Sequence, residues 1–237
     1  LGWSTPAFRP STSWPCLSAP PRRKVRSHAT RLSRPRADDR RTARATLETG
    51  IDLSCPPRVK ICCVSSIDEA QLAIRHGASA VGLVSHMPSG PGVIADELIA
   101  EIAASVPPPV STFLLTALRD ADAIIAQHAV CRTSTIQLVD AVEPDELKRL
   151  RRALPQVKLV QVVHVRSEAS VSEALEVSAN VDALLLDSGN PSLQVKELGG
   201  TGRVHDWQLS RRIRERSPIP VFLAGGLRAS NVHEAVV

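Results

Sequence analysis

The sequence predicts an α/β fold, a (β/α)8 TIM barrel in which seven βα units are present and the eighth is missing. Seven short aliphatic, β-branched runs alternate with longer segments of helical spacing. These runs are apolar on both faces, as in parallel strands covered by helices. Glycines cluster after the sixth and seventh runs, where barrels commonly bind phosphate. The competing fold, an open doubly wound sheet, would place a glycine-rich fingerprint after its first strand, and this chain has none there.

The seven expected strands all lie beyond residue 58. They are residues 59–62, 80–84, 110–115, 134–139, 158–165, 182–187 and 220–224. Helix signals agree with the segments between them: Ser66 to Glu69 is typical of a capping box, Pro144 suits a first helical turn, and Gly77 suits a helix end. The sequence ends within the seventh helical segment. We therefore expect the barrel to be open between its first and seventh strands.

Residues 1–57 form a predicted disordered tail, and residues 58–237 form the predicted incomplete barrel domain. The tail is rich in Pro, Ser and Arg, and its first 50 residues carry 11 Lys and Arg against 3 Asp and Glu. Such a composition buries too little apolar surface to offset its ordering entropy. It fits a transit peptide, or vector-derived or mistranslated sequence ahead of the true start; an RNA-binding arm would want interleaved aromatic residues.

Composition excludes several classes of protein. No apolar run approaches the roughly 18 residues of a membrane span, and the positive charge lies in the tail, so we expect no membrane or nucleic-acid partner. The cysteines contain no CxxC pair, which argues against a zinc site or a disulfide framework and favours a reducing compartment. We expect a cytoplasmic protein, or a plastid one if the tail is a transit peptide. The five cysteines are Cys16, Cys55, Cys62, Cys63 and Cys131.

Four motifs follow expected strands: KICC, LLLDSG, ELGGTGRVHDW and FLAGGL. In a barrel all four project from the face where active sites lie. They bring a thiol, Cys62, and a carboxyl group, Asp187, to the same face as two glycine-rich loops. Consecutive glycines allow backbone N–H groups to converge on an anion, and a helix N-terminus adds a positive dipole end.

In this order and spacing, the motifs resemble KICG, LLLD, GG(S/T)G…DW and (A/S)GGL of the phosphoribosylanthranilate isomerase family, over about residues 58–237. The resemblance implies a barrel enzyme of tryptophan biosynthesis that performs an Amadori rearrangement of N-(5-phosphoribosyl)anthranilate, with no metal and no cofactor. It also implies that Cys62 is the general base and Asp187 the general acid. The implied residues for the substrate phosphate are Gly200, Thr201, Gly202, Gly225 and Gly226.

These two roles make demands on the surroundings. A thiol acts as a base when its pKa falls toward neutrality, which nearby positive charge promotes. An aspartic acid donates a proton when its pKa is raised, and we expect burial at the mouth of an apolar barrel to raise it.

The sequence departs from the family at three places. Cys63 stands where the family has Gly, and it would distort the loop if that position requires a positive φ. Residues 86–94, HMPSGPGVI, replace a basic SxRY-like stretch whose Arg engages the anthranilate part of the substrate. Asp140 ends QLVD, where the family has QLHG. The alternatives are therefore an isomerase of a different phosphorylated amino-sugar, and a non-catalytic or regulatory barrel relative. The sequence predicts no oligomeric state.

Overall fold

The computed structural model describes residues 57–236, apart from residues 191, 195, 197 and 201. The predicted disorder of residues 1–57 thus concerns a segment that lies, except for its last residue, outside the described residues. The strands are β1 Lys60–Ile61, β2 Ala80–Val84, β3 Ser111–Thr116, β4 Thr135–Leu138, β5 Lys158–His164, β6 Ala183–Asp187 and β7 Val221–Leu223. The helices are α2 Ile67–Arg75, α3 Asp96–Ser105, α4 Ala121–Cys131, α5 Pro144–Ala153, α6 Ala169–Val177, α7 Trp207–Arg216 and α8 Val232–Val236.

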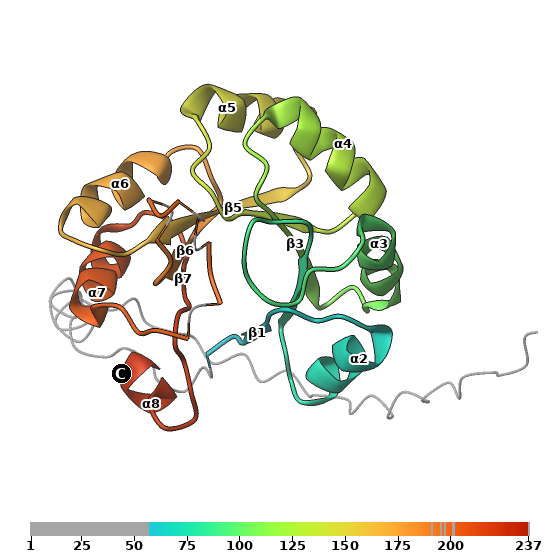
Figure 1. Ribbon diagram of the computed structural model, residues 1–237, viewed down its shortest axis with the longest axis horizontal. Coiled ribbons are helices and arrows are strands. Elements are labelled where there is room, and N and C mark those ends of the chain that lie inside the picture. Colours follow the sequence, from blue (N-terminus) through green and yellow to red (C-terminus); the bar gives the residue numbers. More distant parts are fainter. Residues whose placement is uncertain (1–56, 191, 195, 197, 201, 237) are drawn as a thin grey trace, which may run out of the picture. The chain divides into compact units, whose positions relative to one another are not determined.

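The seven described strands form one sheet in the order β1-β2-β3-β4-β5-β6-β7, and every neighbouring pair is parallel. Figure 1 shows this sheet curled, with the helices along its outer side. The predicted fold class is therefore confirmed: seven consecutive βα units build a half-closed barrel. Within the described residues, β1 and β7 are the two edge strands of the sheet.

The strand at the edge nearest the N-terminus is shorter than predicted. The sequence indicated residues 59–62, but only Lys60 and Ile61 pair with β2. The ladder stops because Cys63 has a φ of 59°, which turns the backbone out of the extended conformation. Pairing resumes once beyond this turn, where the Val64 N–H donates to the Gly82 carbonyl at 3.1 Å.

The predicted helix ends are confirmed. The Ser66 side chain caps α2 by accepting a hydrogen bond from the Glu69 N–H at 3.2 Å. The Glu69 carboxylate accepts from the Ser65 N–H at 2.7 Å, one residue earlier than the reciprocal bond of a standard capping box. Gly77 has a φ of +89° directly after the C-cap of α2. Pro144 begins α5, where a missing N–H costs nothing.

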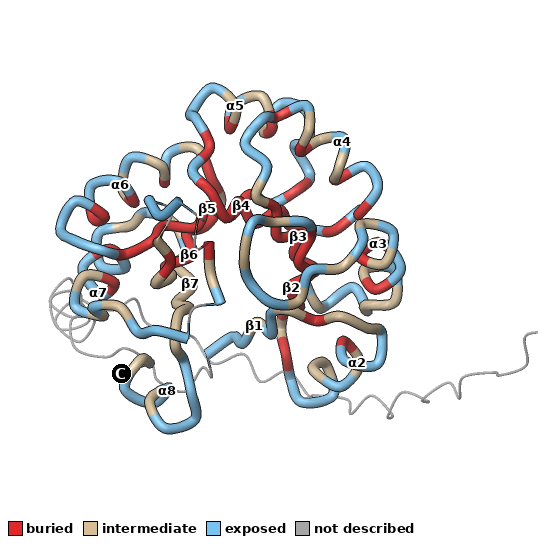
Figure 2. Tube along the Cα trace, in the orientation of Figure 1, coloured by how far each residue is buried: buried red, intermediate tan, exposed pale blue. Residues whose placement is uncertain are grey.

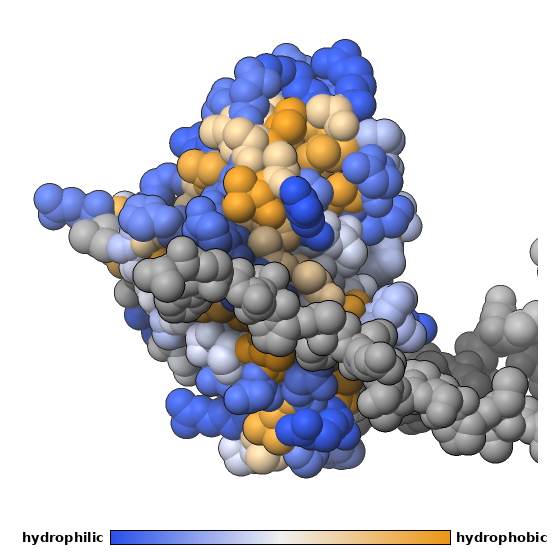
Figure 3. Space-filling view, turned by 90° about the vertical axis from the view of Figure 1, so that its right-hand side faces the viewer, coloured by the Kyte–Doolittle hydropathy of each residue, from blue (hydrophilic) through white to orange (hydrophobic). Residues whose placement is uncertain are grey.

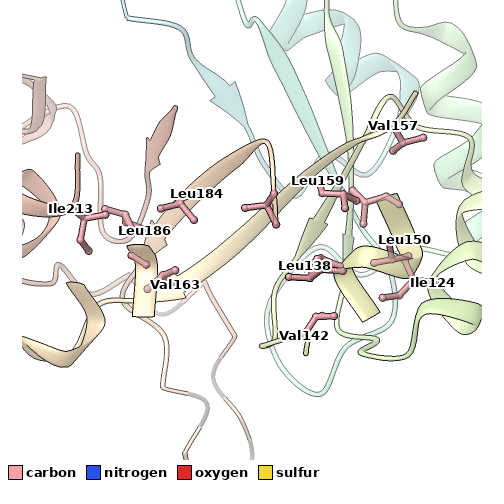
Figure 4. Packing of buried hydrophobic residues seen from close by; sticks show 14 of the residues in the cluster. Ile124, Leu138, Val142, Leu150, Val157, Leu159, Val163, Leu184, Leu186 and Ile213 are labelled. Carbon is pink, nitrogen blue, oxygen red and sulfur yellow. The ribbon is translucent and has the colours of Figure 1, made fainter. Parts of the chain in front are cut away.

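The core has two layers, one on each side of the sheet. The inner layer fills the barrel and includes Val84, Phe113, Val162 and Leu185. Two outer clusters lie between the sheet and the helices. Figure 2 shows the central strands β2 to β6 and the inward sides of the helices mostly buried, while the edge strands β1 and β7 are more exposed. Figure 4 shows packing in an outer cluster that includes Leu186 and Ile213. Successive residues of a strand point alternately into the barrel and toward the helices, so both faces of the central strands are covered.

The outer surface of the helices is mixed in polarity. Figure 3 shows polar residues surrounding smaller apolar areas on one side of the molecule. Among the described residues, no helix is long and apolar enough to cross a membrane.

Candidate active site

The first strand directs Lys60 and Cys62 toward the barrel interior. Lys60 pairs with Ala80, a member of the inner core, and Cys62 follows two residues later on the same side. A Cβ on Gly82 would lie 2.9 Å from the Cys62 sulfur and 3.0 Å from Lys60 Nζ. The glycine therefore leaves the space that both side chains occupy. Cys62 comes directly after β1, at the mouth of the barrel, and is exposed there.

The thiol of Cys62 is electrostatically prepared to lose its proton. Its pKa is lowered from 9.0 to about 6, mainly by a hydrogen bond from the Cys63 thiol and also by the Lys60 ammonium, while burial opposes this change. Lys60 Nζ lies 3.5 Å from the Cys62 sulfur. The pKa of Cys63 is raised in turn, because its thiol is the hydrogen-bond donor. The lowered pKa favours the thiolate of Cys62, the form that can remove a proton.

Cys63 occupies a backbone position that favours glycine. Its φ of 59° lies in the left-handed region, where the Cβ of an L-residue costs roughly 1–2 kcal/mol. The side chain packs tightly, since a Cβ added to Gly92 would lie 2.6 Å from the Cys63 Cβ. The departure from the family motif therefore introduces backbone strain at Cys63, and it also places a second thiol beside Cys62.

We expect Cys63→Gly to relieve that strain and to raise the pKa of Cys62 from about 6 toward 9.0, because the thiol donor is lost. Ultraviolet absorbance of the thiolate as a function of pH measures the shift. Cys63→Ser is the matched control, because its hydroxyl remains a donor. If Cys62 titrates identically in Cys63→Gly and in the unmodified protein, the Cys63 thiol does not lower the pKa of Cys62.

Asp187 ends β6 and lies on the inner side of the barrel mouth. It is in register with His164 of β5 and follows the inner-core residue Leu185 by two positions. The carboxyl group is half-buried, and its Oδ1 accepts a hydrogen bond from the Ser188 N–H at 2.7 Å. The last residue of an almost wholly apolar strand thus places a carboxyl group at the face where the sequence predicted it.

Both glycine-rich loops contact this carboxyl group. A Cβ on Gly199 would lie 3.0 Å from Asp187 Oδ2, and a Cβ on Gly225 would lie 2.9 Å from Oδ1. The two loops also contact each other, since a Cβ on Gly226 would lie 2.7 Å from the carbonyl carbon and oxygen of Arg203. The structure therefore brings together the acid and the loops on which the sequence placed the phosphate.

The described phosphate-site candidates have left-handed backbone conformations, which occur both in tight turns and in anion-binding loops. Gly200, Gly202, Gly225 and Gly226 all have positive φ, between 64° and 83°; Thr201 lies outside the described residues. The positive end of α7 is already occupied, because the Asp206 carboxylate accepts a hydrogen bond from the Gln208 N–H at 2.8 Å. The Gln208 N–H is thus satisfied within α7, so we expect the glycine-rich loops to contribute most of the N–H donors to an anion.

The loop between β2 and α3 joins the two halves of the site. Its Gly92 packs against Cys63, and its Pro91 packs against Gly200, whose added Cβ would lie 2.5 Å from the proline ring. In addition, the Ser89 hydroxyl donates to the Lys196 carbonyl at 2.5 Å. This loop, which lacks the family's Arg, therefore runs from the side of the base to the side of the acid. His86, the only titratable side chain of the stretch, is exposed.

Sequence reasoning missed several polar groups at the mouth. Lys196, from the loop after β6, forms an ion pair with the buried carboxylate of Asp140 after β4. His164 is 7% exposed; its Nε2 lies 3.1 Å from the Val139 carbonyl oxygen, and its Nδ1 has no partner. Burial lowers the pKa of His205, against the opposing effect of Asp187. Alternation along the strand could have identified His164 as inward-facing; nothing local could have identified the Lys196 pair.

Metal binding has no candidate in the part of the chain that the structure describes, because no group of three or more His, Cys, Asp or Glu side chains is arranged to hold an ion.

A curled parallel βα sheet with its polar groups at the carboxyl ends of the strands defines a TIM-barrel protein with a site at the barrel mouth. Residues 59–237 match the sequence model of the family described as N-(5′-phosphoribosyl)anthranilate (PRA) isomerase. The chain belongs to this family.

Individual relatives agree with this assignment. The N-(5′-phosphoribosyl)anthranilate isomerase of Halorubrum lacusprofundi is 37% identical over 180 residues, which cover 76% of this chain and 80% of the relative. Isomerase 2 of Methanosarcina mazei is 33% identical over 180 residues, covering 76% and 79% of the two chains. The chain therefore spans most of the length of these relatives.

Solved structures show the same fold. The phosphoribosyl anthranilate isomerase of Thermotoga maritima matches with a TM-score of 0.65 and 26% identity, covering 76% of this chain and 82% of that one. A phosphoribosyl anthranilate isomerase in complex with reduced 1-(o-carboxyphenylamino)-1-deoxyribulose 5-phosphate matches with a TM-score of 0.62 and 24% identity, covering 76% and 81%.

Proposed function

We propose that the protein is an N-(5′-phosphoribosyl)anthranilate isomerase, which converts its substrate to the 1-deoxyribulose 5-phosphate product in tryptophan biosynthesis. The observation that carries the proposal is the mouth of the barrel, where the Cys62 thiol with its pKa of about 6 and the Asp187 carboxyl group both face inward. Family membership supports it, as does the phosphorylated ketose analogue in the complex of a relative.

Asp187 acts first, as the general acid. The furanose ring opens when a proton is delivered to its ring oxygen, which then leaves C1 as a hydroxyl group while the substrate nitrogen forms an imine with C1. The half-buried carboxyl group of Asp187 supplies this proton. Gly199 and Gly225 permit the sugar to approach it, because a side chain at either position would crowd the carboxyl oxygens.

Cys62 acts next, as the general base. Its thiolate removes the proton from C2, and the electron pair of that C–H bond moves toward the imine to give an enolamine. Protonation at C1 and loss of the enol proton at C2 then produce the ketone. The reaction is an internal rearrangement, so protons taken and given balance within the cycle. Base and acid lie at the carboxyl ends of two different strands and both face the inside of the barrel, so we propose that they act on the same sugar from two sides.

The 5′-phosphate would bind between the two glycine-rich loops. Their glycines have positive φ values, a conformation that lets neighbouring N–H groups converge on one anion. The contact between Gly226 and the Arg203 backbone fixes one loop against the other. A phosphate bound between these loops would lie near Asp187, which suits a substrate whose reactive ring is joined to the phosphate through a single carbon.

An isomerase assay tests the proposal. We expect the protein to abolish the anthranilate-type fluorescence of the substrate as the rearrangement proceeds, and we expect Cys62→Ala to lower kcat by at least about 100-fold, as for loss of a general base. Cys131→Ala is the matched control. Cys131 is a buried free thiol in α4, remote from the barrel mouth in sequence and fold, and burial raises its pKa to about 12. The substitution should therefore cost stability but not turnover. Absence of turnover, or normal turnover in Cys62→Ala, contradicts the assignment.

One observation favours a second candidate, an isomerase of a different phosphorylated amino-sugar. The loop of residues 86–94 reaches across the site but contains neither Arg nor Lys. The carboxylate of anthranilate would then lack the partner that the family motif supplies. Assaying the same protein with a substrate whose aglycone has no carboxylate distinguishes the two: a kcat/KM equal to or above that for the anthranilate substrate favours the second candidate.

The remaining expectations follow from this function. The partner is a small phosphorylated sugar, with no nucleic acid and no membrane involved. We propose that the protein acts in the cytoplasm. The relatives come from archaea and cyanobacteria, and they lend no support to a plastid location.

A further inference from the structure

The ammonium group of Lys60 faces the barrel interior beside Cys62, the proposed base. Lys60 Nζ lies 3.5 Å from the Cys62 sulfur and 5.2 Å from the centre of the Phe113 ring. The pairing of Lys60 with Ala80 turns its side chain toward the inner core, on the side of the sheet where charged residues are uncommon. The Lys60 side chain is half-buried, so its ammonium group loses part of its hydration, and a partner within the protein offsets that loss.

The partner is not a carboxylate. Among the described residues, no Asp or Glu lies within ion-pair distance of Lys60, whose polar contacts are the Cys62 sulfur and the face of Phe113. An aromatic face stabilises a cation by about 0.5–2 kcal/mol but does not neutralise it. The sulfur of Cys62, when it carries a negative charge, is thus the counter-ion available to Lys60.

Glycine at position 82 makes this pair possible. A Cβ there would lie 2.9 Å from the Cys62 sulfur and 3.0 Å from Lys60 Nζ, and 3.3 Å from the Cys62 Cα. Both ends of the pair therefore fill the space left open by one missing side chain. The neighbouring strand β2 contributes no charged residue to compete.

We propose that Lys60 is a positioning residue for the isomerase reaction: its ammonium, seated on Phe113, holds the Cys62 sulfur at the barrel mouth as a thiolate ready to accept the sugar proton. The inference deepens the proposed function and rests on it for the use of that thiolate. The Lys60–Cys62 pair itself is a property of the free protein and can be tested without substrate.

Other groups around Cys62 are accounted for. Cys63, from the following loop, donates its thiol hydrogen bond. Glu69, in α2, and His76, the C-cap residue of α2, line a hollow of about 420 Å³ beside β1 that Cys62 also lines. Glu69 is engaged with Ser65 through two hydrogen bonds of 2.7 and 2.9 Å. Lys60 is therefore the cation in contact with the sulfur.

The test replaces Lys60 by Met, which keeps the aliphatic chain and removes the charge. The rate at which iodoacetamide alkylates Cys62, followed by mass spectrometry of its peptide as a function of pH, reports the thiolate. We expect a midpoint of about 6 in the unmodified protein. In Lys60→Met we expect the midpoint to rise by at least about 1, which lowers alkylation at pH 6 about fivefold. Lys60→Arg keeps the charge and should stay within about twofold.

The pH profile of kcat/KM separates this role from a merely structural one. The loss in Lys60→Met should be largest at low pH and should disappear above the new midpoint, whereas damaged packing would lower kcat/KM at every pH. If Lys60→Met is too unstable to purify, Lys60→Gln replaces it in both measurements. An unchanged alkylation midpoint in either neutral variant overturns the proposal. Full activity of Cys62→Ala would refute the proposed function of Cys62 instead, and the alkylation measurement would still decide the role of Lys60.

Discussion

Asp187→Asn is expected to lower kcat by 100-fold or more while leaving substrate binding nearly unchanged. Asparagine has the shape of aspartic acid and can still accept the 2.7 Å hydrogen bond from the Ser188 N–H, but it has no acidic proton to deliver to the ring oxygen. General acid–base groups contribute typically about 10²–10⁴ to a rate. Steady-state kinetics by loss of substrate fluorescence measures kcat and KM separately.

Asp182 offers a matched control for Asp187, because it is a second aspartate at the other end of the same strand. It directly precedes β6, at the opposite end from Asp187, and its carboxylate binds Arg151 at 2.6 Å, Lys158 at 3.2 Å and the Leu159 N–H at 2.9 Å. Burial alone would raise the pKa of Asp182, but these partners lower it overall. Asp182→Asn should therefore destabilise the fold by about 1–3 kcal/mol and leave kcat unchanged.

The pH dependence of stability provides an internal check on that control. Because the pKa of Asp182 is lower in the folded protein, its stabilisation is present above the unfolded value of about 3.9 and is lost as the pH falls through the folded value. The difference in free energy of unfolding between Asp182→Asn and the unmodified protein should shrink below about pH 4. A kcat for Asp187→Asn no lower than that of Asp182→Asn would remove Asp187 from the chemistry.

Local sequence patterns were sufficient to predict the framework of this site. Strand β2 was placed at its observed bounds, and Asp187 was placed at the end of β6, because burial on both faces leaves an uninterrupted apolar run that a polar residue terminates. The departure at Cys63 was also interpretable, since a family glycine suggests a positive φ and the structure has φ 59° there. The strand features depend on neighbouring residues alone, and the conformation of Cys63 followed from comparison with the family motif.

Contacts between distant loops could not be predicted in the same way. The ion pair of Lys196 with Asp140 joins residues 56 apart, and the packing of Pro91 on Gly200 joins two loops whose conformations no periodicity describes. Lys60 is an intermediate case: alternation with Cys62 places it inward, but its position over Phe113 depends on the register of three strands. The sequence was thus sufficient to predict which residues carry the acid and the base. It was not sufficient to predict the charged and aromatic groups that surround them.

Gly226→Ala is expected to raise KM by about tenfold or more, equivalent to roughly 1.4 kcal/mol of binding free energy. Gly226 has a φ of 64°, and an added Cβ would lie 2.7 Å from both the carbonyl carbon and the oxygen of Arg203. These are backbone atoms, which cannot rotate away as the end of a side chain can. The two glycine-rich loops would have to separate, and the N–H groups that we propose for the phosphate would no longer converge.

Gly77→Ala is the matched control, because it distinguishes the steric clash in Gly226→Ala from the strain of a left-handed alanine. Gly77 also has positive φ, at 89°, but an added Cβ there meets no atom within 4 Å, and the residue lies at the end of α2. Both variants should lose about 1–2 kcal/mol of stability from the left-handed backbone, while only Gly226→Ala should raise KM. Inorganic phosphate should inhibit the unmodified protein and Gly77→Ala competitively and should inhibit Gly226→Ala much more weakly. Equal KM values in the two alanine variants would mean that the Gly226 loop is a turn that does not hold the phosphate.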